Sequence, residues 1–441
     1  MEPIGVGIIT IVIFLVLLFS GFYVAVALGV AGFIGISAIV GLGPAMSVLA
    51  TQAFHYGTQY SFIIIPLFVA MGLFAAEGGV SKDAYDGMAK WLGGIKGGLG
   101  HATIAACAMF GTLTGSSIIT AVVFAKISVP EMKRLGYEAK LSYGLVSSAG
   151  AIGLLIPPNL MAVIYALLTE ESLGKLLMAG IGPGIVMALC LSLGFVAILV
   201  WRPSWGPPGG EMRATWRERI ASLPKLWSIL VVGFVIIGGI YFGIFTVNEA
   251  SGIGTLLLLV LYLCIKGLSK KSWQVIMTAL RESISLTAMV LFVLIGAQIF
   301  ARAIVLSRIG PKFSEIVIGW NLSPVLFVLA MAVVFLILGC FIDGISTMAI
   351  TIPIVYPMVV KMGIDNIWFA TVMIVATQVG NITPPFGLCV YAVKAVAGPD
   401  YSIEDIFKGA FPFLIFELIC LAIVMGFPAV SLWIPYNIWT Y

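Results

Sequence analysis

Charged residues are scarce in this sequence. Asp, Glu, Lys and Arg make up only 10% of its 441 residues, whereas soluble domains contain about 25%. Hydrophobic residues account for 61%. A soluble fold needs far more charge to cover its surface, so the composition excludes a soluble globular protein. The net charge of +4 is small, and the basic residues cluster near the ends of apolar runs, as membrane orientation requires. We therefore expect no nucleic-acid partner.

Histidine and paired cysteines are also lacking. The two histidines, His55 and His101, are expected near the membrane edges without a carboxylate partner, which argues against a histidine proton relay. The six cysteines stand in apolar segments without paired spacing, which favours buried thiols over disulfides or metal ligands. No Gly-rich phosphate loop, metalloprotease motif or nucleophile motif occurs. We expect no enzymatic activity, no catalytic residue and no organic cofactor.

Long apolar runs are what the sequence does contain. A helix that crosses the hydrocarbon core needs roughly 20 apolar residues, and runs of this length include Ile8–Val40, Leu226–Phe245 and Phe411–Val430. The first run has no basic segment before it, only Glu2, and no small-residue cleavage site, so we interpret it as a retained helix. The sequence predicts an all-α polytopic protein in a lipid bilayer.

The chain has two halves with matching landmarks. Gly153-Leu-Leu-Ile-Pro-Pro158 reappears 227 residues later as Gly380-Asn-Ile-Thr-Pro-Pro385. Gly111-Thr-Leu-Thr-Gly-Ser-Ser117, followed by Pro130, corresponds to Gly339–Thr347, followed by Pro357. We predict two repeats, residues 1–200 and 226–441, joined by the polar linker 201–225.

The basic residues predict that the two repeats are inverted. The linker contains Arg202, Arg213, Arg217, Arg219 and Lys225, so it should be cytoplasmic. Equivalent loops of the two halves differ in charge. The loop 39–60 has no Lys or Arg, while the matching loop 266–281 has four. The loop 82–96 is more basic than its counterpart 308–323. This difference is expected of loops on opposite sides of the membrane. Both termini should be periplasmic.

Each half contains two interrupted segments. The glycines near residues 112–117 and the group 343–347 predict re-entrant hairpins over about 101–130 and 323–357. The Gly-x-x-x-Pro-Pro motifs predict broken helices over about 141–169 and 367–396. Transporters with inverted repeats bind their substrate and coupling ions where such helices are interrupted.

Polar residues gather at these interruptions. Unwound carbonyls and Ser, Thr, Asn or Asp oxygens suit Na⁺, and the N-termini of half-helices suit a carboxylate. The candidates are Thr112, Thr114, Ser116, Ser117, Ser147, Ser148 and Asn159 in the first half, and Asp343, Ser346, Thr347, Thr377, Gln378, Asn381 and Thr383 in the second. The alternative is that the hydroxyls only help helices to pack. An ionisable group inside a membrane segment is usually functional, so Asp343 is either an ion ligand or a helix cap.

The ordered set of motifs resembles a known family. The chain is similar from about residue 4 to 430 to the large membrane subunit of tripartite ATP-independent periplasmic (TRAP) transporters, the DctM-like permeases. The resemblance is carried by Ile65-Pro-Leu-Phe-Val-Ala-Met-Gly72, Gly111–Ser117, Val129-Pro-Glu-Met-Lys133, Ile152–Tyr165, Val247-Asn-Glu-Ala-Ser251, Gly339–Asp343, Ile382-Thr-Pro-Pro-Phe-Gly387 and Gly398–Pro412.

The resemblance implies both a fold and an activity. The fold would be that of the wider ion-transporter superfamily, with a scaffold and a transport region that moves as an elevator. The activity would be secondary, Na⁺-coupled import of an organic acid anion, such as a C4-dicarboxylate or sialic acid, across the bacterial inner membrane. The partners would be a soluble periplasmic binding protein and a separate small four-helix membrane subunit.

The resemblance also implies where the ligands bind. One Na⁺ would lie among Ser116, Ser117, Gly150 and Gly153. Another would lie among Asp343, Ser346, Thr347, Gly380, Asn381 and Thr383. The substrate would contact Thr114, Ser116, Asn159, Ile345, Ser346 and Pro385. Lys126 departs from the small or neutral residue expected at its position, which leaves open whether a cation meets the substrate there.

Two other functions remain open. A sodium–carboxylate or anion transporter of the same superfamily would work without a binding protein. A structural subunit of a membrane electron-transfer complex would need histidine pairs, cysteine clusters or further carboxylates within the membrane. The identity of the substrate cannot be predicted, because in this family the binding protein does most of the selecting.

Overall fold

The computed structural model describes residues 2–207, 214–309, 312 and 322–437. Residues 208–213 of the predicted linker, most of the predicted loop 308–323 and the last four residues lie outside this part. Every regular element within it is a helix. Eight of the described helices are long and apolar enough to cross a membrane, and one bent pair would make a ninth. The prediction of an all-α polytopic membrane protein is confirmed.

The helices of the first half follow one another with short connections. They are α1 (Pro3–Phe19), α2 (Val24–Val40), α3 (Leu42–Thr58), α4 (Ile64–Glu77), α5 (Val80–Leu92), α6 (Gly98–Thr114), α7 (Ser117–Arg134), α8 (Ala139–Ala149), α9 (Ile152–Leu155), α10 (Leu160–Thr169), α11 (Leu173–Ala179) and α12 (Ile181–Trp201).

The second half begins with a short helix at the end of the predicted linker. Its helices are α13 (Trp216–Ser222), α14 (Trp227–Tyr241), α15 (Val247–Lys266), α16 (Lys270–Leu306), α18 (Pro324–Phe341), α19 (Gly344–Lys361), α20 (Asn366–Gly380), α21 (Leu388–Ala397), α22 (Ile403–Gly426) and α23 (Ala429–Asn437).

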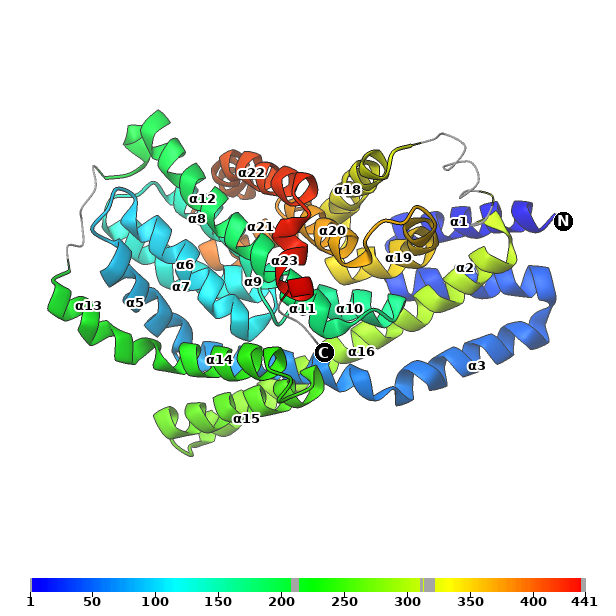
Figure 1. The fold of residues 1–441 in the computed structure, drawn as a ribbon, viewed down its shortest axis with the longest axis horizontal. Coiled ribbons are helices and arrows are strands. Elements are labelled where there is room, and N and C mark those ends of the chain that lie inside the picture. The colour runs from blue at the N-terminus through cyan, green and yellow to red at the C-terminus, as the bar shows by residue number, and fades with distance from the viewer. Residues whose placement is uncertain (1, 208–213, 310–311, 313–321, 438–441) are drawn as a thin grey trace.

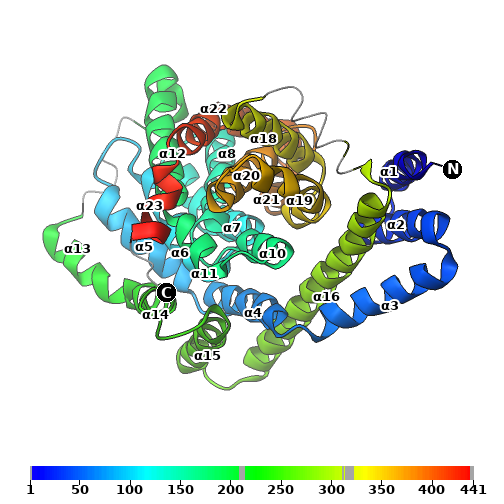
Figure 2. The same ribbon diagram turned by 45° about the vertical axis from the view of Figure 1, so that its right-hand side comes forward.

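A central group of helices is flanked by two smaller ones. Helices α6–α12 and α18–α23 form the central group, with α1, α2, α3 and the long α16 on one side and α13, α14 and α15 on another (Figures 1 and 2). Helix α16 packs against α2, α3 and α4 and reaches α19 of the central group. The central group therefore contains all four segments that the sequence marks as interrupted.

Two helical hairpins meet inside the central group. The segment 101–130 falls within α6 and α7, which are joined at Gly115 and Ser116; Gly115 has a φ of +56°, a conformation that favours glycine. The segment 323–357 falls within α18 and α19, which are joined at Ile342 and Asp343. The side chains of Ser116 and Asp343 cap the returning helices α7 and α19.

Each broken helix follows a hairpin in the chain. Residues 139–169 form α8, α9 and α10, and the helices before and after Pro157-Pro158 are bent by 42°. Residues 366–397 form α20 and α21, separated by 381–387, where Pro384-Pro385 interrupts the helix. Proline removes a backbone donor and clashes with the preceding turn, so the breaks are encoded locally.

Glycines bring each hairpin against a broken helix. A methyl group added at Gly111 of α6 would lie 2.6 Å from the Cα of Gly153 in α9. In the other half, one added at Gly380 of α20 would lie 2.8 Å from the Cα of Gly339 in α18. The returning arms cross over: α7 packs against α21, and α19 packs against α10. Each half thus completes the surroundings of the other half's hairpin.

The crossing of α8 and α22 is equally close. A methyl group added at Gly144 of α8 would overlap the backbone of Gly409 in α22, and one added at Gly409 would overlap the carbonyl oxygen of Lys140. At the same end of the crossing the ammonium of Lys140 pairs with Asp405 at 2.9 Å. Small residues allow such close approach of helices in membranes.

We therefore predict that Gly409→Ala lowers the stability of the folded protein. The extra methyl group must push α22 away from α8, and overpacking of this kind costs about 1–3 kcal/mol. The thermal unfolding midpoint of the purified protein in detergent should fall by several degrees. The control is Gly426→Ala on the same helix, where nothing lies within 4 Å of the added methyl group. Equal midpoints for the two variants would contradict the close crossing.

Candidate functional site

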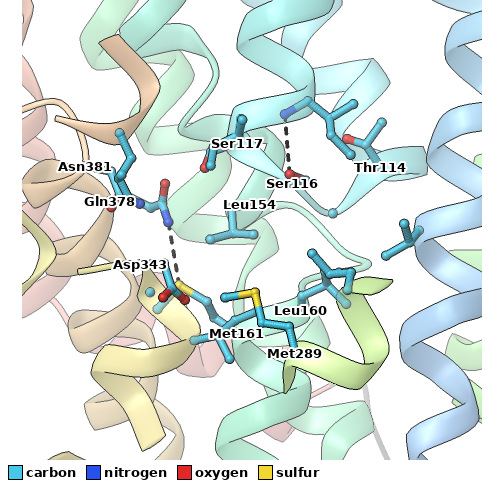
Figure 3. A pocket seen from close by; sticks show the side chains of 18 of the residues that line it. Thr114, Ser116, Ser117, Leu154, Leu160, Met161, Met289, Asp343, Gln378 and Asn381 are labelled. Atoms are coloured by element: carbon cyan, nitrogen blue, oxygen red, sulfur yellow. Dashed lines mark hydrogen bonds between the residues drawn. The ribbon is translucent and has the colours of Figure 1, made fainter. Parts of the chain in front are cut away.

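The two hairpin tips face a cavity of about 510 Å³. Figure 3 shows Asp343, Gln378 and Asn381 gathered on one side of the cavity and Thr114 and Ser116 on the other. The lining comes from both hairpins, both broken helices, α4 and α16: Val69, Thr114, Gly115, Ser116, Ser117, Ile118, Ile119, Leu154, Leu160, Met161, Glu282, Ser285, Leu286, Met289, Asp343, Gly344, Ile345, Gln378, Asn381 and Leu388. Segments far apart in the chain therefore share one site.

Four helices begin at this cavity. Ser117 is the first residue of α7, Leu160 of α10, Gly344 of α19 and Leu388 of α21, and all four line the cavity. The first turn of a helix has backbone N–H groups without a partner in the helix and carries a partial positive charge. Four such ends around one space make it suitable for an anion.

The caps of these helices are local. The Ser116 side chain accepts from the Ile119 N–H at 3.4 Å, and the Asp343 carboxylate accepts from the Ser346 N–H at 3.0 Å. Each cap satisfies one of the free N–H groups and leaves the others. Asp343 is thus a helix cap, one of the two roles that its sequence position suggested, and the cap occupies one of its two carboxylate oxygens.

Several polar oxygens at the second hairpin tip and in the broken helix beside it form no hydrogen bond. They are the hydroxyl oxygens of Ser346 and Thr347, whose residues are fully buried, and the amide oxygens of Gln378 and Asn381. Burying a polar group without a partner costs about 1–3 kcal/mol. Such a group therefore indicates a ligand or water that satisfies it.

Other hydroxyls of the central group contrast with these. Thr351 donates to the carbonyl oxygen of Thr347 at 2.7 Å, Ser147 to that of Tyr143 at 2.9 Å, and Thr377 to that of Met373 at 2.8 Å. Hydroxyls in helices commonly bond to the preceding turn in this way. These hydroxyls are satisfied within the fold, unlike those of Ser346 and Thr347.

The first hairpin tip presents backbone oxygens to glycines. A methyl group at Gly150 would lie 2.8 Å from the carbonyl oxygen of Ser117, and one at Gly153 would lie 3.3 Å from that of Ser116. The hydroxyl of Thr120 donates to the Ser116 carbonyl at 2.8 Å. Only glycine leaves space beside these carbonyls, where α8 ends and α9 begins.

The residues expected at the substrate site do not all line the cavity. Thr114, Ser116 and Ile345 line it, whereas Ser346 lies buried behind the second tip. Asn159 is also buried, and its side-chain oxygen accepts from the N–H groups of Met161 and Ala162, which caps α10. Pro385 is exposed and is not part of the lining.

The residues expected at the ion sites are likewise divided. Ser117, Asp343 and Asn381 line the cavity. Thr347 and Gly380 are buried beside it, and Thr383 donates its hydroxyl to the carbonyl oxygen of Val379 at 2.6 Å.

Several lining residues were not predicted from the sequence, among them Met161, Met289 and Glu282. Met161 accepts from the Gln378 amide at 3.6 Å, and Met289 and Glu282 reach the cavity from α16. Glu282 could have been noted because it follows Arg281 in a long apolar helix. None of the described lining residues is Lys, Arg or His, and Lys126 is exposed outside the lining.

The unpartnered hydroxyl of Thr347 yields a stability prediction. Thr347→Val should leave the unfolding midpoint in Na⁺-free buffer unchanged or higher, because it removes a buried group that has no partner. The matched change Thr351→Val removes a hydrogen bond and should cost about 1 kcal/mol. Thermal unfolding in choline chloride compares them. A larger loss for Thr347→Val would show that its hydroxyl is already bonded.

Comparison with known proteins identifies the family. The family described as "Tripartite ATP-independent periplasmic transporter, DctM component" matches residues 11–430. The C4-dicarboxylate TRAP transporter large permease protein DctM of Pseudomonas aeruginosa is 35% identical over 388 residues, which is 88% of this chain and 89% of that protein. The isethionate TRAP transporter permease protein DctMQ of Oleidesulfovibrio alaskensis is 29% identical and covers 95% of this chain, which spans 65% of that longer protein.

The fold has a solved counterpart at lower identity. The YdaH transporter of Alcanivorax borkumensis has a TM-score of 0.65 and 15% identity, and the similarity covers 99% of both chains. This likeness supports the fold alone. The resemblance found in the motifs is confirmed by the family match over almost the whole chain. The chain belongs to the DctM family, the large permease components of TRAP transporters, which are secondary transporters rather than enzymes.

Proposed function

We propose that this permease imports an organic acid anion together with Na⁺. The observation that supports this proposal most is the pairing of two kinds of group at one cavity. Four helix N-termini suit an anion, and buried oxygens without a hydrogen-bond partner suit a hard cation. An uncoupled anion channel would need no unpartnered oxygens behind its hairpin tip.

In this proposal Na⁺ occupies both hairpin tips. At the second tip the ligands are the free oxygen of Asp343, the hydroxyls of Ser346 and Thr347, and oxygens of the broken helix at Gly380 and Asn381. At the first tip they are carbonyls near Ser116, Ser117, Gly150 and Gly153. Bound Na⁺ offsets the charge of Asp343 and adds positive charge beside the substrate.

The substrate is an organic anion that the cavity binds without a cationic side chain. The described lining has two carboxylates and no basic residue, so the attraction comes from helix ends and from Na⁺. Binding of the anion then depends on Na⁺, which couples the two. The relatives named for C4-dicarboxylate and isethionate transport are consistent with a small acid.

We propose that the halves are inverted repeats and that the central group moves as an elevator. The contact between Gly111 and Gly153 in the first half corresponds to the contact between Gly339 and Gly380 in the second. The packing of α7 on α21 likewise corresponds to the packing of α19 on α10. Helices α2, α4, α15 and α16 would form the scaffold.

The partners follow from the family. TRAP permeases work with a periplasmic binding protein and usually with a small membrane subunit, and the name DctMQ describes a permease with both membrane parts in one chain. We propose that this chain receives its anion from such a binding protein and assembles with a separate small subunit of four helices in the inner membrane.

The proposal predicts uptake that depends on Na⁺ and on the charge of Asp343. Proteoliposomes with the binding protein and small subunit should accumulate labelled anion only with an inward Na⁺ gradient. Asp343→Asn keeps a good helix cap but removes the negative charge. The Na⁺ concentration for half-maximal uptake should therefore rise about tenfold or more. Membrane insertion of this variant should be normal. Asp343→Ala should lose both the cap and the coupling.

The comparison of the two Asp343 variants separates the roles. Uptake that ignores Na⁺ in the unmodified protein would remove the coupling claim. Equal defects of insertion and of Na⁺ dependence in Asp343→Asn would leave only the capping role. Uptake at full rate without the binding protein would instead favour a stand-alone transporter.

The proposed orientation predicts the accessibility of two exposed serines. Cys264 is the exposed native cysteine of the described part and would first be removed. In that background, Ser47→Cys should react with a membrane-impermeant maleimide in spheroplasts. Ser204→Cys in the linker should react only after the membrane is opened. Reaction of Ser204→Cys in closed spheroplasts would place the linker outside and contradict the charge argument.

A further inference from the structure

A buried carboxyl group that does not line the cavity lies on α22. Glu417 is fully buried, and neither of its side-chain oxygens has a hydrogen-bond partner among the described residues. The polar group that faces it is the hydroxyl of Ser148 on α8, which is also fully buried and unpartnered. The Gly144 and Gly409 contact holds these two helices together.

No cation among the described residues pairs with this carboxyl. Among the described residues, the titratable groups that face it are thiols: Cys389 of α21 and Cys420 of α22, with Cys190 of α12 beside Cys420. The Lys140 ammonium of α8 pairs with Asp405 at the start of α22, and that of Lys394 on α21 donates to the Gly398 carbonyl. Helices α12, α18 and α20 also pack on α22, and none of the three contains a charged residue.

The ligand that fits this place is a proton. An isolated carboxylate in apolar surroundings is so costly that the group takes up a proton instead. A metal ion would need several oxygens, whereas one carboxyl and one hydroxyl are unpartnered here, and no group of three His, Cys, Asp or Glu that could hold a metal is found in the described part. A neutral acid needs only one acceptor for its proton, and the Ser148 hydroxyl that faces it can serve as that acceptor.

The carboxyl lies close to the first hairpin tip. Ser148 stands two residues before Gly150, at the end of α8 that faces the carbonyl of Ser117. The thiol of Cys389 faces both Ser117 and Glu417. A charge at Glu417 would therefore act on a cation at that tip through buried protein, where screening by salt is weak.

We propose that Glu417 and Ser148 form a proton-binding site coupled to the first Na⁺ site. With the tip empty, the Glu417 carboxyl is neutral. When Na⁺ binds at the tip, the carboxyl releases its proton to water and the carboxylate stabilises the ion, so that one positive charge replaces another. Coupling is reciprocal, so protonation weakens Na⁺ binding. This inference rests on the proposed Na⁺ site.

The first test detects the proton directly. Infrared difference spectra of the purified protein should show the carbonyl band of a neutral carboxylic acid in Na⁺-free buffer at neutral pH, and the band should diminish on addition of Na⁺. The band should be absent from Glu417→Gln and present in the control Glu404→Gln, an exposed position on the same helix. Absence of the band from the unmodified protein would overturn the inference.

The second test measures the coupling. The Na⁺ concentration for half-maximal uptake should be about tenfold higher at about pH 6 than at about pH 8 in the unmodified protein and in Glu404→Gln. In Glu417→Gln, which mimics the neutral acid, it should be high at both pH values. Ser148→Ala should alter the band and reduce the pH dependence, and it provides the same test if Glu417→Gln does not fold.

The outcomes separate this inference from the proposed function. The Na⁺ concentration for half-maximal uptake could keep its pH dependence in Glu417→Gln or Ser148→Ala while uptake still depends on Na⁺. That result would overturn the coupling of Glu417 to the Na⁺ site and leave the proposed function intact. Uptake without any Na⁺ dependence in the unmodified protein would overturn Na⁺ coupling and this inference together, while the infrared band would still show whether the carboxyl holds a proton.

Discussion

The structure depends on one constraint: inside the membrane, a polar group must find its partner within the protein. Helices satisfy nearly all backbone groups, because hydrocarbon offers no water. Serine and threonine hydroxyls such as those of Ser147 and Thr377 bond to the preceding turn. Against this background, a buried polar oxygen without a partner is informative, and several of them lie at the second hairpin tip and at Glu417.

The same constraint explains why the site consists of interrupted helices. A break exposes N–H and C=O groups that the fold tolerates only where a ligand, a cap or close packing satisfies them. Glycine at 111, 153, 339 and 380 allows the backbones to approach within van der Waals contact around the breaks. The N-termini of α7, α10, α19 and α21 are thereby held at one cavity. An anion and its coupling ion can bind there side by side and offset each other's charge.

Much of this arrangement could be predicted from the sequence, because glycine, proline and polar residues act locally. The hairpin tips near Ser116 and Asp343 and the breaks at the two Pro-Pro pairs follow from short motifs. The lining by α16 could not be predicted, since Glu282 and Met289 meet the cavity only through long-range packing. Asn159 and Thr383 are polar residues that the fold uses for local bonds, and this depends on side-chain geometry. Glu417 was missed although a lone acid in an apolar helix is a recognisable signal.

The central claim is that the unpartnered oxygens at the hairpin tips coordinate Na⁺. The most direct measurement is electron cryomicroscopy of the permease with its small subunit, in NaCl and in choline chloride. The account predicts density in Na⁺ alone, within coordination distance of the Ser346 and Thr347 hydroxyls, one Asp343 oxygen and the broken helix near Asn381. Hydroxyls bonded to neighbouring residues, with no ion density in NaCl, would contradict it.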